Sequence, residues 1–425
     1  MSGIRFCDEC QNILHPEEEK TEHRLLFVCK SCDYREYIQD TTSMEENKIY
    51  QRDFVQSFTA SFIDPDYCLD PSMPREKTIC PNCRYTECAY LIDKEPGDKF
   101  LRKIYICGRV NKNGRPDCRN IFSPIKYHKG KNETFAYREY GETHEDILVM
   151  LHGNLTSSYI FEKTFAKLST GFRVIAPDLR GFGLSSYANK VTSLDDLAED
   201  VESLMKDLKI LKYNVLGWDM GAAVALKIAI GSPASIDKLV LVNPIGLTGK
   251  TYVRDAEDLT PLPEWPEDAE SITKDKRCVE FINAFNDKKK DFFKTYFIDE
   301  IYTKKTPENE RLDSYIDNFS SQRSFPEILA CLAHYDISET GTGEIYKVQN
   351  STLILSGKDD FKTPSKDAID IHKAIDAYST LKIFEDGGHV LMEDCMDEFI
   401  ETVAEFCFQQ IEEEQEQEAD EEMNE

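Results

Sequence analysis

Long hydrophobic runs are missing from this sequence of 425 residues, and so is an excess of positive charge. No apolar stretch approaches the roughly 20 residues that span a bilayer, and residues 1–6 lack the apolar segment of a secretory signal. The formal net charge of −28 argues against non-specific nucleic-acid binding, because a phosphate backbone repels such a surface. We therefore expect a soluble intracellular protein with no membrane association and no direct sequence-specific nucleic-acid binding.

Basic residues are absent from the last fifteen positions, Ile411–Glu425, which hold nine acidic ones. Such a stretch repels itself and has little apolar surface to bury. We expect residues 411–425 to form an acidic disordered tail.

Cysteines are crowded into one part of the chain, since ten of the fourteen precede Asn120. In a reducing compartment, paired spacing indicates metal binding and not disulfides. The first pairs are Cys7-x2-Cys10 and Cys29-x2-Cys32, with eighteen residues between them. Each pair can form a knuckle that grips one face of a tetrahedral zinc ion, and the intervening hairpin returns the second pair to the first. We predict a zinc ribbon with a structural zinc ion in residues 1–45.

A second group comprises Cys80, Cys83, Cys107 and Cys118, in which ten residues separate the last two cysteines. A knuckle needs about two intervening residues, so this site closes only if residues 108–117 loop out. On that condition we predict a second structural zinc ion in a ribbon over residues 76–124, joined to the first by a linker over residues 46–75. Cys68 and Cys88 are expected to be free thiols.

The residues around these cysteines resemble the small ninth subunit of eukaryotic RNA polymerase II, which consists of two zinc ribbons. The resemblance covers nearly all of residues 4–122 and includes the segments Arg5-Phe6-Cys7, Arg24-Leu25-Leu26-Phe27, Asp70-Pro71-Ser72-Met73-Pro74-Arg75 and Cys80-Pro81-x-Cys83. It implies docking on the large subunits of RNA polymerase II, a nuclear location and no catalytic residue in this part.

Two features of the second ribbon bear on this resemblance. The family's last two ligands form a Cys-x2-Cys pair, so the ten residues after Cys107 look like an insertion, either real or a retained intron. A related ribbon, that of the transcript-cleavage factor, needs an adjacent Asp-Glu pair at its hairpin tip. Residues 91–98 contain no such pair, and we interpret the ribbon as a docking module.

The rest of the chain is organised around Gly217-Trp218-Asp219-Met220-Gly221, where an apolar run gives way to a helical pattern. Glycines on both sides permit a sharp turn from strand to helix, and the turn lifts Asp219 to its tip. The free N–H groups at the start of the following helix favour an anion there. This turn resembles the nucleophile elbow of the α/β-hydrolase family, with Asp in place of the more frequent Ser.

Apolar runs before and after this turn alternate with helical patterns, which predicts a doubly wound, mostly parallel sheet. The expected strands are residues 134–141, 147–151, 172–176, 214–219, 238–242, 351–356 and 381–384, and Ser193 is expected to cap a helix. Asp178 and Arg180 are expected to pair and hold their loop. We predict an α/β-hydrolase domain over residues 125–410, with a helical cap at about 244–348 that selects the substrate.

The resemblance to α/β-hydrolases supplies the remaining site residues in the family's chain order of nucleophile, acid and histidine. Asp360 follows a predicted strand and precedes Pro364, His389 follows Asp386-Gly387-Gly388, and Asn154 lies in the turn His152-Gly153-Asn154. The implied catalytic residues are Asp219, Asp360 and His389, and the implied oxyanion hole is formed by backbone N–H groups near Asn154 and at Met220. His152 itself is interpreted as a structural turn residue.

A carboxylate nucleophile favours displacement at a saturated carbon over attack on an ester carbonyl. Asp219 would form an alkyl-enzyme ester, which His389 would hydrolyse with Asp360 orienting its ring. The resemblance to epoxide hydrolases requires cap tyrosines, for which Tyr252, Tyr296, Tyr302 and Tyr315 are candidates. Dehalogenation is disfavoured, because the family's second halide donor, a Trp directly after the nucleophile, is Met220 here.

Two alternatives stay open at this point. The residues around Asp219 also resemble the serine-esterase branch, so Asp219 could mark an inactive hydrolase. No physical reason links the two halves of the chain, so they are either a true fusion or two neighbouring genes joined in a predicted sequence. A hydrolase of this kind is usually cytoplasmic, whereas the ribbons imply the nucleus.

Overall fold

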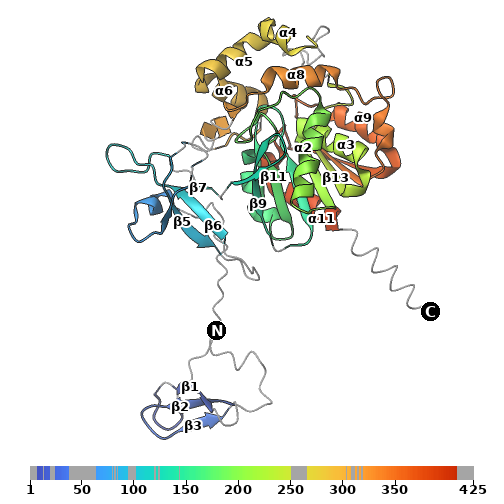
Figure 1. The fold of residues 1–425 in the computed structure, drawn as a ribbon. Helices are drawn as coiled ribbons and strands as arrows, with labels where there is room; N and C mark the ends of the chain where they lie inside the picture. Colours follow the sequence, from blue (N-terminus) through green and yellow to red (C-terminus); the bar gives the residue numbers. More distant parts are fainter. Residues whose placement is uncertain are drawn as a thin grey trace, which may run out of the picture. The chain divides into compact units, whose positions relative to one another are not determined.

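The computed structural model describes residues 7–12, 14–19, 24–37, 64–78, 80, 83, 85–93, 102–118, 121–122, 125–142, 144–249, 266–302, 304–307, 312–313, 315–316 and 319–408 (Figure 1). The predicted acidic tail and most of the predicted linker lie outside these residues. The chain divides into two compact units, and the boundary falls between the two groups of cysteines. Within the described part of the chain, no helix combines the length and the apolar character needed to cross a bilayer.

The first ribbon is a three-stranded antiparallel sheet in the order β1-β2-β3, formed by β1 (Leu14–Glu19), β2 (Arg24–Cys29) and β3 (Arg35–Tyr37). Its buried apolar cluster consists of Cys7, Leu14, Phe27 and Cys29. So small a cluster cannot offset the conformational entropy of the segment. The ribbon therefore needs another source of stability.

The second ribbon is a four-stranded antiparallel sheet in the order β4-β5-β6-β7. Its strands are β4 (Arg75–Glu76), β5 (Cys88–Asp93), β6 (Arg102–Cys107) and β7 (Ile121–Phe122). A short helix, η2 (Pro65–Leu69), lies in the segment predicted as linker, and its Cys68 packs in one cluster with Ala89 and Ile106. The C-terminal part of that segment thus belongs structurally to the second ribbon.

Residues 108–117 form a small hairpin of their own. Val110 and Pro116 make an antiparallel bridge, and the Asp117 amide donates to the Arg109 carbonyl at 2.9 Å. The hairpin leaves the sheet after Cys107 and returns the chain at Cys118. Residues 108–117 therefore loop out, which was the condition for a second metal site.

The C-terminal domain is built on an eight-stranded sheet in the order β15-β14-β13-β12-β10-β11-β9-β8. Neighbours from β15 to β11 pair in parallel, whereas β9 and β8 pair antiparallel at one edge. The strands are β8 (Lys126–Lys129), β9 (Thr134–Tyr140), β10 (Ile147–Leu151), β11 (Arg173–Pro177), β12 (Tyr213–Asp219), β13 (Ile236–Pro244), β14 (Thr352–Gly357) and β15 (Ser379–Phe384). The predicted doubly wound, mostly parallel sheet is confirmed.

Helices connect and cover these strands. They are α1 (Glu162–Leu168), α2 (Leu194–Asp207), α3 (Met220–Gly231), α9 (Ser365–Ile375), α10 (Leu391–Asp394) and α11 (Met396–Phe408), with short η3 (Ser158–Phe161), η4 (Pro233–Ser235), η7 (Glu344–Lys347) and η8 (Asp376–Tyr378). The predicted cap at Ser193 is present as a capping box with Asp196. The central strand β12 is buried at every residue, which explains its unbroken apolar run.

Helices also form the inserted cap, as predicted, in the part of it that the structure describes. They are α4 (Ala269–Lys274), α5 (Lys276–Asp287), α6 (Lys290–Tyr296), the π-helical turn η6 (Phe297–Ile301) and α8 (Phe325–His334). The helices α4, α5, α6 and α8 gather on one side of the C-terminal domain (Figure 1). Aromatic rings fill this layer, for example Phe297 stacked on Phe319 with centroids 3.8 Å apart.

Candidate active site and zinc sites

Asp219 lies at the sharp turn between β12 and α3, with backbone angles φ 56° and ψ −122°. This conformation is strained for a residue with a side chain and costs about 1–3 kcal/mol. A Cβ atom on Gly217 would lie 2.2 Å from the Gly221 carbonyl oxygen, and one on Gly221 would lie 2.2 Å from that of Leu151. Both glycines are therefore required for the turn, as the sequence predicted.

The predicted turn at His152-Gly153-Asn154 meets Asp219 directly. The Asn154 amide donates to Asp219 Oδ2 at 2.9 Å, and the Met220 amide also donates to the carboxyl group. A Cβ atom on Gly153 would come within 2.6 Å of the same oxygen. Two backbone donors therefore converge on one carboxyl group, which is the arrangement that stabilises a developing oxyanion.

His389 and Asp360 form the second part of the site. His389 Nδ1 and Asp360 Oδ2 are 2.9 Å apart, and both side chains are buried. The other Asp360 oxygen accepts backbone N–H groups from Lys362 at 2.8 Å and Thr363 at 2.9 Å. These contacts fix the carboxylate, which in turn orients the imidazole ring.

Three neighbours support His389 that the sequence analysis missed as site residues. Asn243, at the end of β13, donates through Nδ2 to the His389 carbonyl at 2.6 Å, and Trp218 donates to the same carbonyl at 2.9 Å. The Thr363 hydroxyl lies 2.7 Å from Asp360 Oδ2 and 3.3 Å from His389 Nδ1. The one available signal was the place of Asn243 at a strand end, where this sheet gathers its functional side chains.

Burial and charge shift the pKa values of Asp219 and His389. Burial raises the pKa of the Asp219 carboxyl, against the opposing effects of His389 and of the Met220 and Asn154 amides. For His389, burial disfavours the imidazolium, but the charge and hydrogen bond of Asp360 outweigh it and raise the pKa. Both groups thus titrate at a higher pH than they would in water.

His152 has a structural place, as expected. Its Nε2 accepts the Leu179 amide at 3.0 Å, which leaves the proton on Nδ1 to bond the Gly153 carbonyl at 2.8 Å. Burial lowers the pKa of this imidazole, so it stays neutral.

The expected pairing of Asp178 with Arg180 is wrong. Arg180 binds Asp200 through two hydrogen bonds of 2.6 and 2.7 Å. Asp178 accepts instead from the amide and hydroxyl groups of Ser158, at 2.9 and 2.6 Å. The prediction relied on the proximity of the two charges in the sequence. In the structure, the loop directs their side chains to different elements.

The candidate cap tyrosines differ in their surroundings. Tyr315 donates to Glu393 Oε1 at 3.1 Å, and Tyr302 stacks on Tyr315 with centroids 6.1 Å apart. Tyr296 lies under the ammonium group of Lys362, 5.5 Å from the ring centroid. Tyr252 lies outside the described residues.

The cap also touches the oxyanion turn through Gln322, which precedes α8. Its Nε2 donates to Asn154 Oδ1 at 3.0 Å, and both side chains are buried. The next residue, Arg323, donates its amide to the Gly181 carbonyl at 2.8 Å. This segment therefore ties the cap to the core beside Asp219.

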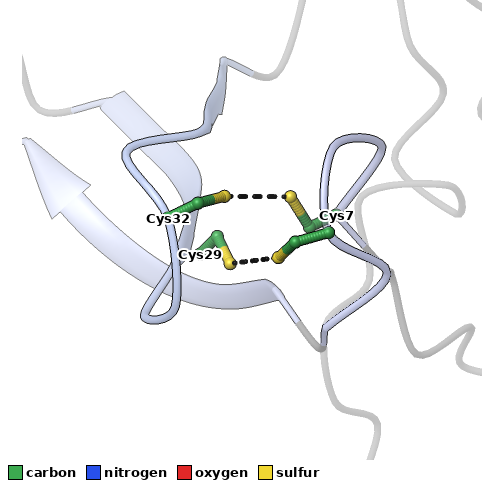
Figure 2. A group of neighbouring side chains, drawn as sticks. Cys7, Cys29 and Cys32 are labelled. Atoms are coloured by element: carbon green, nitrogen blue, oxygen red, sulfur yellow. Dashed lines mark hydrogen bonds between the residues drawn. The ribbon is translucent and has the colours of Figure 1, made fainter.

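The cysteine clusters have the geometry of two four-thiolate sites. In the first, Cys7 Sγ lies 3.4 Å from Cys32 Sγ, and Cys10 lies 3.4 Å from Cys29. Figure 2 shows Cys7 facing Cys29 and Cys32 across the gap between two loops. A disulfide would need about 2.0 Å, whereas a tetrahedral zinc site with Zn–S bonds of about 2.3 Å separates its sulfurs by about 3.8 Å. The cluster therefore fits a zinc ion.

The second cluster meets the same test despite its long spacing. Cys80 and Cys118 have sulfurs 3.7 Å apart, and those of Cys83 and Cys107 are 3.4 Å apart. In both clusters all four sulfur atoms lie within 4.8 Å of one another. The two clusters can each hold a structural zinc ion, and the thiolates of residues 80, 83, 107 and 118 would be its ligands.

Comparisons with known proteins agree with a chain made of zinc ribbons and a hydrolase. The family model described as alpha/beta hydrolase fold matches residues 146–394, more than half of the chain. Subunit 9A of DNA-directed RNA polymerases II, IV and V of Arabidopsis thaliana is 31% identical over 112 residues, which are 26% of this chain and 94% of the subunit. The chain thus belongs to the alpha/beta hydrolase family and, in its N-terminal part, to the family of RNA polymerase II subunit 9.

Two further relatives concern the hydrolase domain. An uncharacterized hydrolase of Saccharomyces cerevisiae is 33% identical over 132 residues, which are 30% of this chain and 44% of that protein. The chain therefore matches under half of the yeast hydrolase's length. The solved esterase of Exiguobacterium antarcticum has a TM-score of 0.52 and 25% identity, and covers 65% of this chain and 96% of its own.

Proposed function

We propose that the C-terminal domain is a hydrolase that forms an alkyl ester on Asp219, with a small molecule such as an epoxide as its substrate. The observation that carries the proposal is the Asp219 carboxyl group, whose Oδ2 accepts the Asn154 amide at 2.9 Å. With Oδ2 held there, Oδ1 is the oxygen that would attack. The adjacent pair of His389 and Asp360, 2.9 Å apart, supplies the base for the second step.

In the first step Asp219 Oδ1 bonds to an epoxide carbon, the carbon–oxygen bond of the ring breaks, and the leaving oxygen takes a proton. Tyr296 is the candidate donor of that proton. Its ring lies under the ammonium group of Lys362, and Lys362 interacts electrostatically with Asp219. In the second step His389 removes a proton from water, and the resulting hydroxide attacks the ester carbonyl carbon. Oδ2 then carries the oxyanion charge against the two amides. On collapse the bond between the carboxyl carbon and Oδ1 breaks, and Oδ1 leaves with the proton from His389 as part of the diol.

Isotope labelling tests this reaction. After a single turnover of the full chain in water enriched in oxygen-18, mass spectrometry should find one heavy oxygen in the peptide that contains Asp219. In the His389→Gln variant the ester should accumulate as an adduct with the mass of the epoxide added to that peptide. If a panel of epoxides and alkyl esters gives neither label nor adduct, covalent catalysis by Asp219 is wrong.

The competing proposal is that the domain is an esterase relative made inactive by Asp at the nucleophile position. The residues Gly217-Trp218 and Met220-Gly221, which resemble the serine-esterase branch, and the similarity to a solved esterase favour it. Replacement by Asp219→Ser distinguishes the two proposals. If the domain is an inactive esterase relative, the variant should gain hydrolysis of small phenyl esters. If the domain uses Asp219 as nucleophile, the variant should lose its own activity and gain no esterase activity.

For the ribbons we propose association with RNA polymerase II, and hence a nuclear location when this role is exercised. The support is similarity over 94% of the plant polymerase subunit together with two thiolate clusters of zinc-site geometry. The full chain should copurify with the large polymerase subunits, and Cys29→Ser should abolish this. The Asp219→Asn variant is the matched control and should copurify normally, because it leaves the ribbons untouched. If the wild-type chain does not copurify, the polymerase role fails and a cytoplasmic hydrolase remains. If Cys29→Ser copurifies as the wild type does, the first zinc ribbon is not what binds the polymerase.

A tryptic peptide decides whether both roles belong to one molecule. Cleavage after Arg119 and Lys126 gives Asn120–Lys126, which crosses the predicted junction. Mass spectrometry of native extract should find this peptide if the chain is a fusion. Recovery of peptides from both sides without the crossing peptide would assign the two roles to separate proteins.

A further inference from the structure

The peptide unit that joins Gly153 to Asn154 carries one of the two oxyanion donors. Its N–H donates to Asp219 Oδ2 at 2.9 Å. Its carbonyl, which points the opposite way in a trans peptide, accepts the Thr156 hydroxyl at 2.8 Å and lies 2.8 Å from His152 Nδ1. The core therefore holds the carbonyl end of this peptide plane.

The other end of the peptide leads into a strained residue. Leu155, directly after Asn154, has φ 55°, a left-handed value that residues with side chains rarely adopt. Such a conformation persists where the surrounding contacts over-determine it. The contacts of the Gly153 carbonyl lie on one side of Asn154, so a restraint at the Asn154 side chain is what fixes the N–H from its own residue.

Gln322 supplies that restraint from the cap. Its Nε2 donates to Asn154 Oδ1 at 3.0 Å, and both side chains are 5% exposed. The next residue, Arg323, donates its amide to the Gly181 carbonyl at 2.8 Å and its guanidinium group to the Ser185 carbonyl. The bonds of Arg323 thus anchor the backbone beside Gln322 independently of Asn154, and the Gln322 side chain reaches the turn from a fixed base.

We propose that Gln322 is a positioning residue of the oxyanion hole, which holds the Asn154 N–H in line with Asp219 Oδ2. It acts through the Asn154 side chain and not on the substrate. In the proposed reaction Oδ2 gains charge when water attacks the ester carbonyl, so hydrolysis of the ester depends on this N–H. The role of Gln322 in turnover rests on the proposed function, whereas its effect on the Asn154 N–H does not.

The first measurement follows the Asn154 N–H and needs no substrate. The full zinc-loaded chain is labelled with 15N-asparagine, and the Asn154 amide signal is assigned by its loss in Asn154→Ala. Its proton should resonate downfield, because its acceptor is a carboxyl oxygen, and should move upfield in Gln322→Met. Exchange of this proton with deuterium should become about tenfold faster in that variant, as expected for one weakened buried hydrogen bond. An unchanged signal and exchange rate overturn the proposal.

Ser324→Ala is the matched control in the same segment. Ser324 is fully buried, and among the residues that the structure describes its hydroxyl makes no hydrogen bond. The variant removes a polar group two residues from Gln322 and leaves the bond to Asn154 in place. The Asn154 signal should match that of the wild type. An equal change in Ser324→Ala and Gln322→Met would show that any disturbance of the segment moves the turn, and the specific role of Gln322 would be lost.

A double replacement tests whether Gln322 acts through the Asn154 side chain. Asn154→Ala removes the acceptor Oδ1 but retains the backbone N–H, which 15N-alanine labelling makes visible. Adding Gln322→Met to this variant should change neither the signal nor the exchange rate, because the contact between the two side chains is already gone. A further change as large as that in the wild-type background contradicts the proposed route.

Single turnover with styrene oxide as the probe measures the effect on the reaction. In Gln322→Met, hydrolysis of the ester should slow by about 10- to 100-fold, less than the roughly 100- to 1000-fold cost of deleting an oxyanion donor. Ester formation should keep the wild-type rate, because the Asp219 carboxylate loses charge in that step. A loosened cap would instead slow both steps alike, and that result would count against positioning.

Failure of this proposal and failure of the proposed reaction can be told apart. If Asp219 takes no heavy oxygen but the Asn154 signal moves in Gln322→Met, the covalent reaction fails while the positioning role holds. If the ester forms, and neither its hydrolysis nor the Asn154 signal changes in Gln322→Met, the reaction stands and the role of Gln322 falls.

Discussion

The ribbons and the hydrolase domain obtain their stability in opposite ways. Each ribbon has buried apolar clusters of about four residues, half of them metal-site cysteines in the first ribbon. The hydrolase domain has one large apolar core, and every residue of β12 and most of α3 are buried in the domain. Each ribbon thus depends on a metal ion for its fold. The hydrolase domain buries enough apolar surface to tolerate the backbone strain at Asp219.

The ribbons and the hydrolase domain also differ in the chemistry that they can support. The ribbon metal sites are closed by four thiolates, which leaves no open position for a substrate and restricts them to a structural role. The hydrolase core instead buries a carboxylate and an imidazole, those of Asp219 and His389, where charges interact strongly. The following predictions test how independent the two regions are.

Removal of zinc should have the largest effect. A strong chelator should unfold both ribbons, since metal binding supplies their folding free energy, and should leave the hydrolase domain folded. Hydrogen exchange read by mass spectrometry should show lost protection in β2 and β5 but retained protection in β12. Loss of protection in β12 as well would show that the regions depend on one another.

Replacement of Gly153 by Ala should affect the hydrolase alone. The new Cβ atom would lie 2.6 Å from Asp219 Oδ2 and 2.7 Å from Asp219 Cβ, so the nucleophile must move. A displacement of this kind costs about 100-fold in the rate of ester formation, measured by single turnover. Gly231→Ala is the control, because no atom lies within 4 Å of its added Cβ. Equal rates in the two variants would contradict the proposed position of the nucleophile.

The acid side of the pH profile should follow Asp219. In the proposed reaction the Asp219 carboxylate is the attacking form, and burial raises its pKa above the ordinary value of 3.8. Ester formation should therefore fall as pH decreases through this raised pKa, about tenfold for each further unit. Hydrolysis of the ester needs neutral His389, whose raised pKa moves that step to higher pH. Single-turnover rates against pH measure both limbs, and an ester-formation limb at the pKa of an exposed Asp would contradict the assignment.

The smallest expected effect is a gain in stability in Asp219→Asn. A carboxyl group whose pKa is raised in the folded state costs stability above that pKa, where it is ionised, and the cost disappears at lower pH. Asn retains an acceptor for the Asn154 amide without the charge. The hydrolase transition in calorimetry at neutral pH should rise by roughly 2–4 °C, for a gain on the order of 1 kcal/mol. A lower transition would show that the charge is already compensated.

The sequence predicts much of this molecule because its signals are local. The apolar run of β12, the glycines at 217 and 221, the cap at Ser193 and the spaced cysteines all act within a few residues. Asp219, Asp360 and His389 lie at or after the ends of three strands of a parallel sheet, and such strand ends share one edge.

What sequence reasoning missed comes from separate segments that meet only after folding. Gln322 and Asn154 are far apart in the chain, as are Lys362 and Tyr296, yet each pair is in contact. A lysine on a polar loop has the same local pattern whether its ammonium group faces water or lies over the ring of a distant tyrosine. The wrong pairing of Asp178 with Arg180 has the same origin, since side-chain direction on a loop depends on its fold.

The hairpin between Cys107 and Cys118 offers an experimental handle. Lengthening a loop from two residues to ten costs only about 1.4 kcal/mol in closure entropy, little beside the free energy of zinc binding. At its tip, Gly114 has φ 73° and no atom within 4 Å of an added Cβ. A fluorescent group or short peptide inserted next to Gly114 would sit between two zinc ligands and report metal loading without touching the catalytic half of the chain.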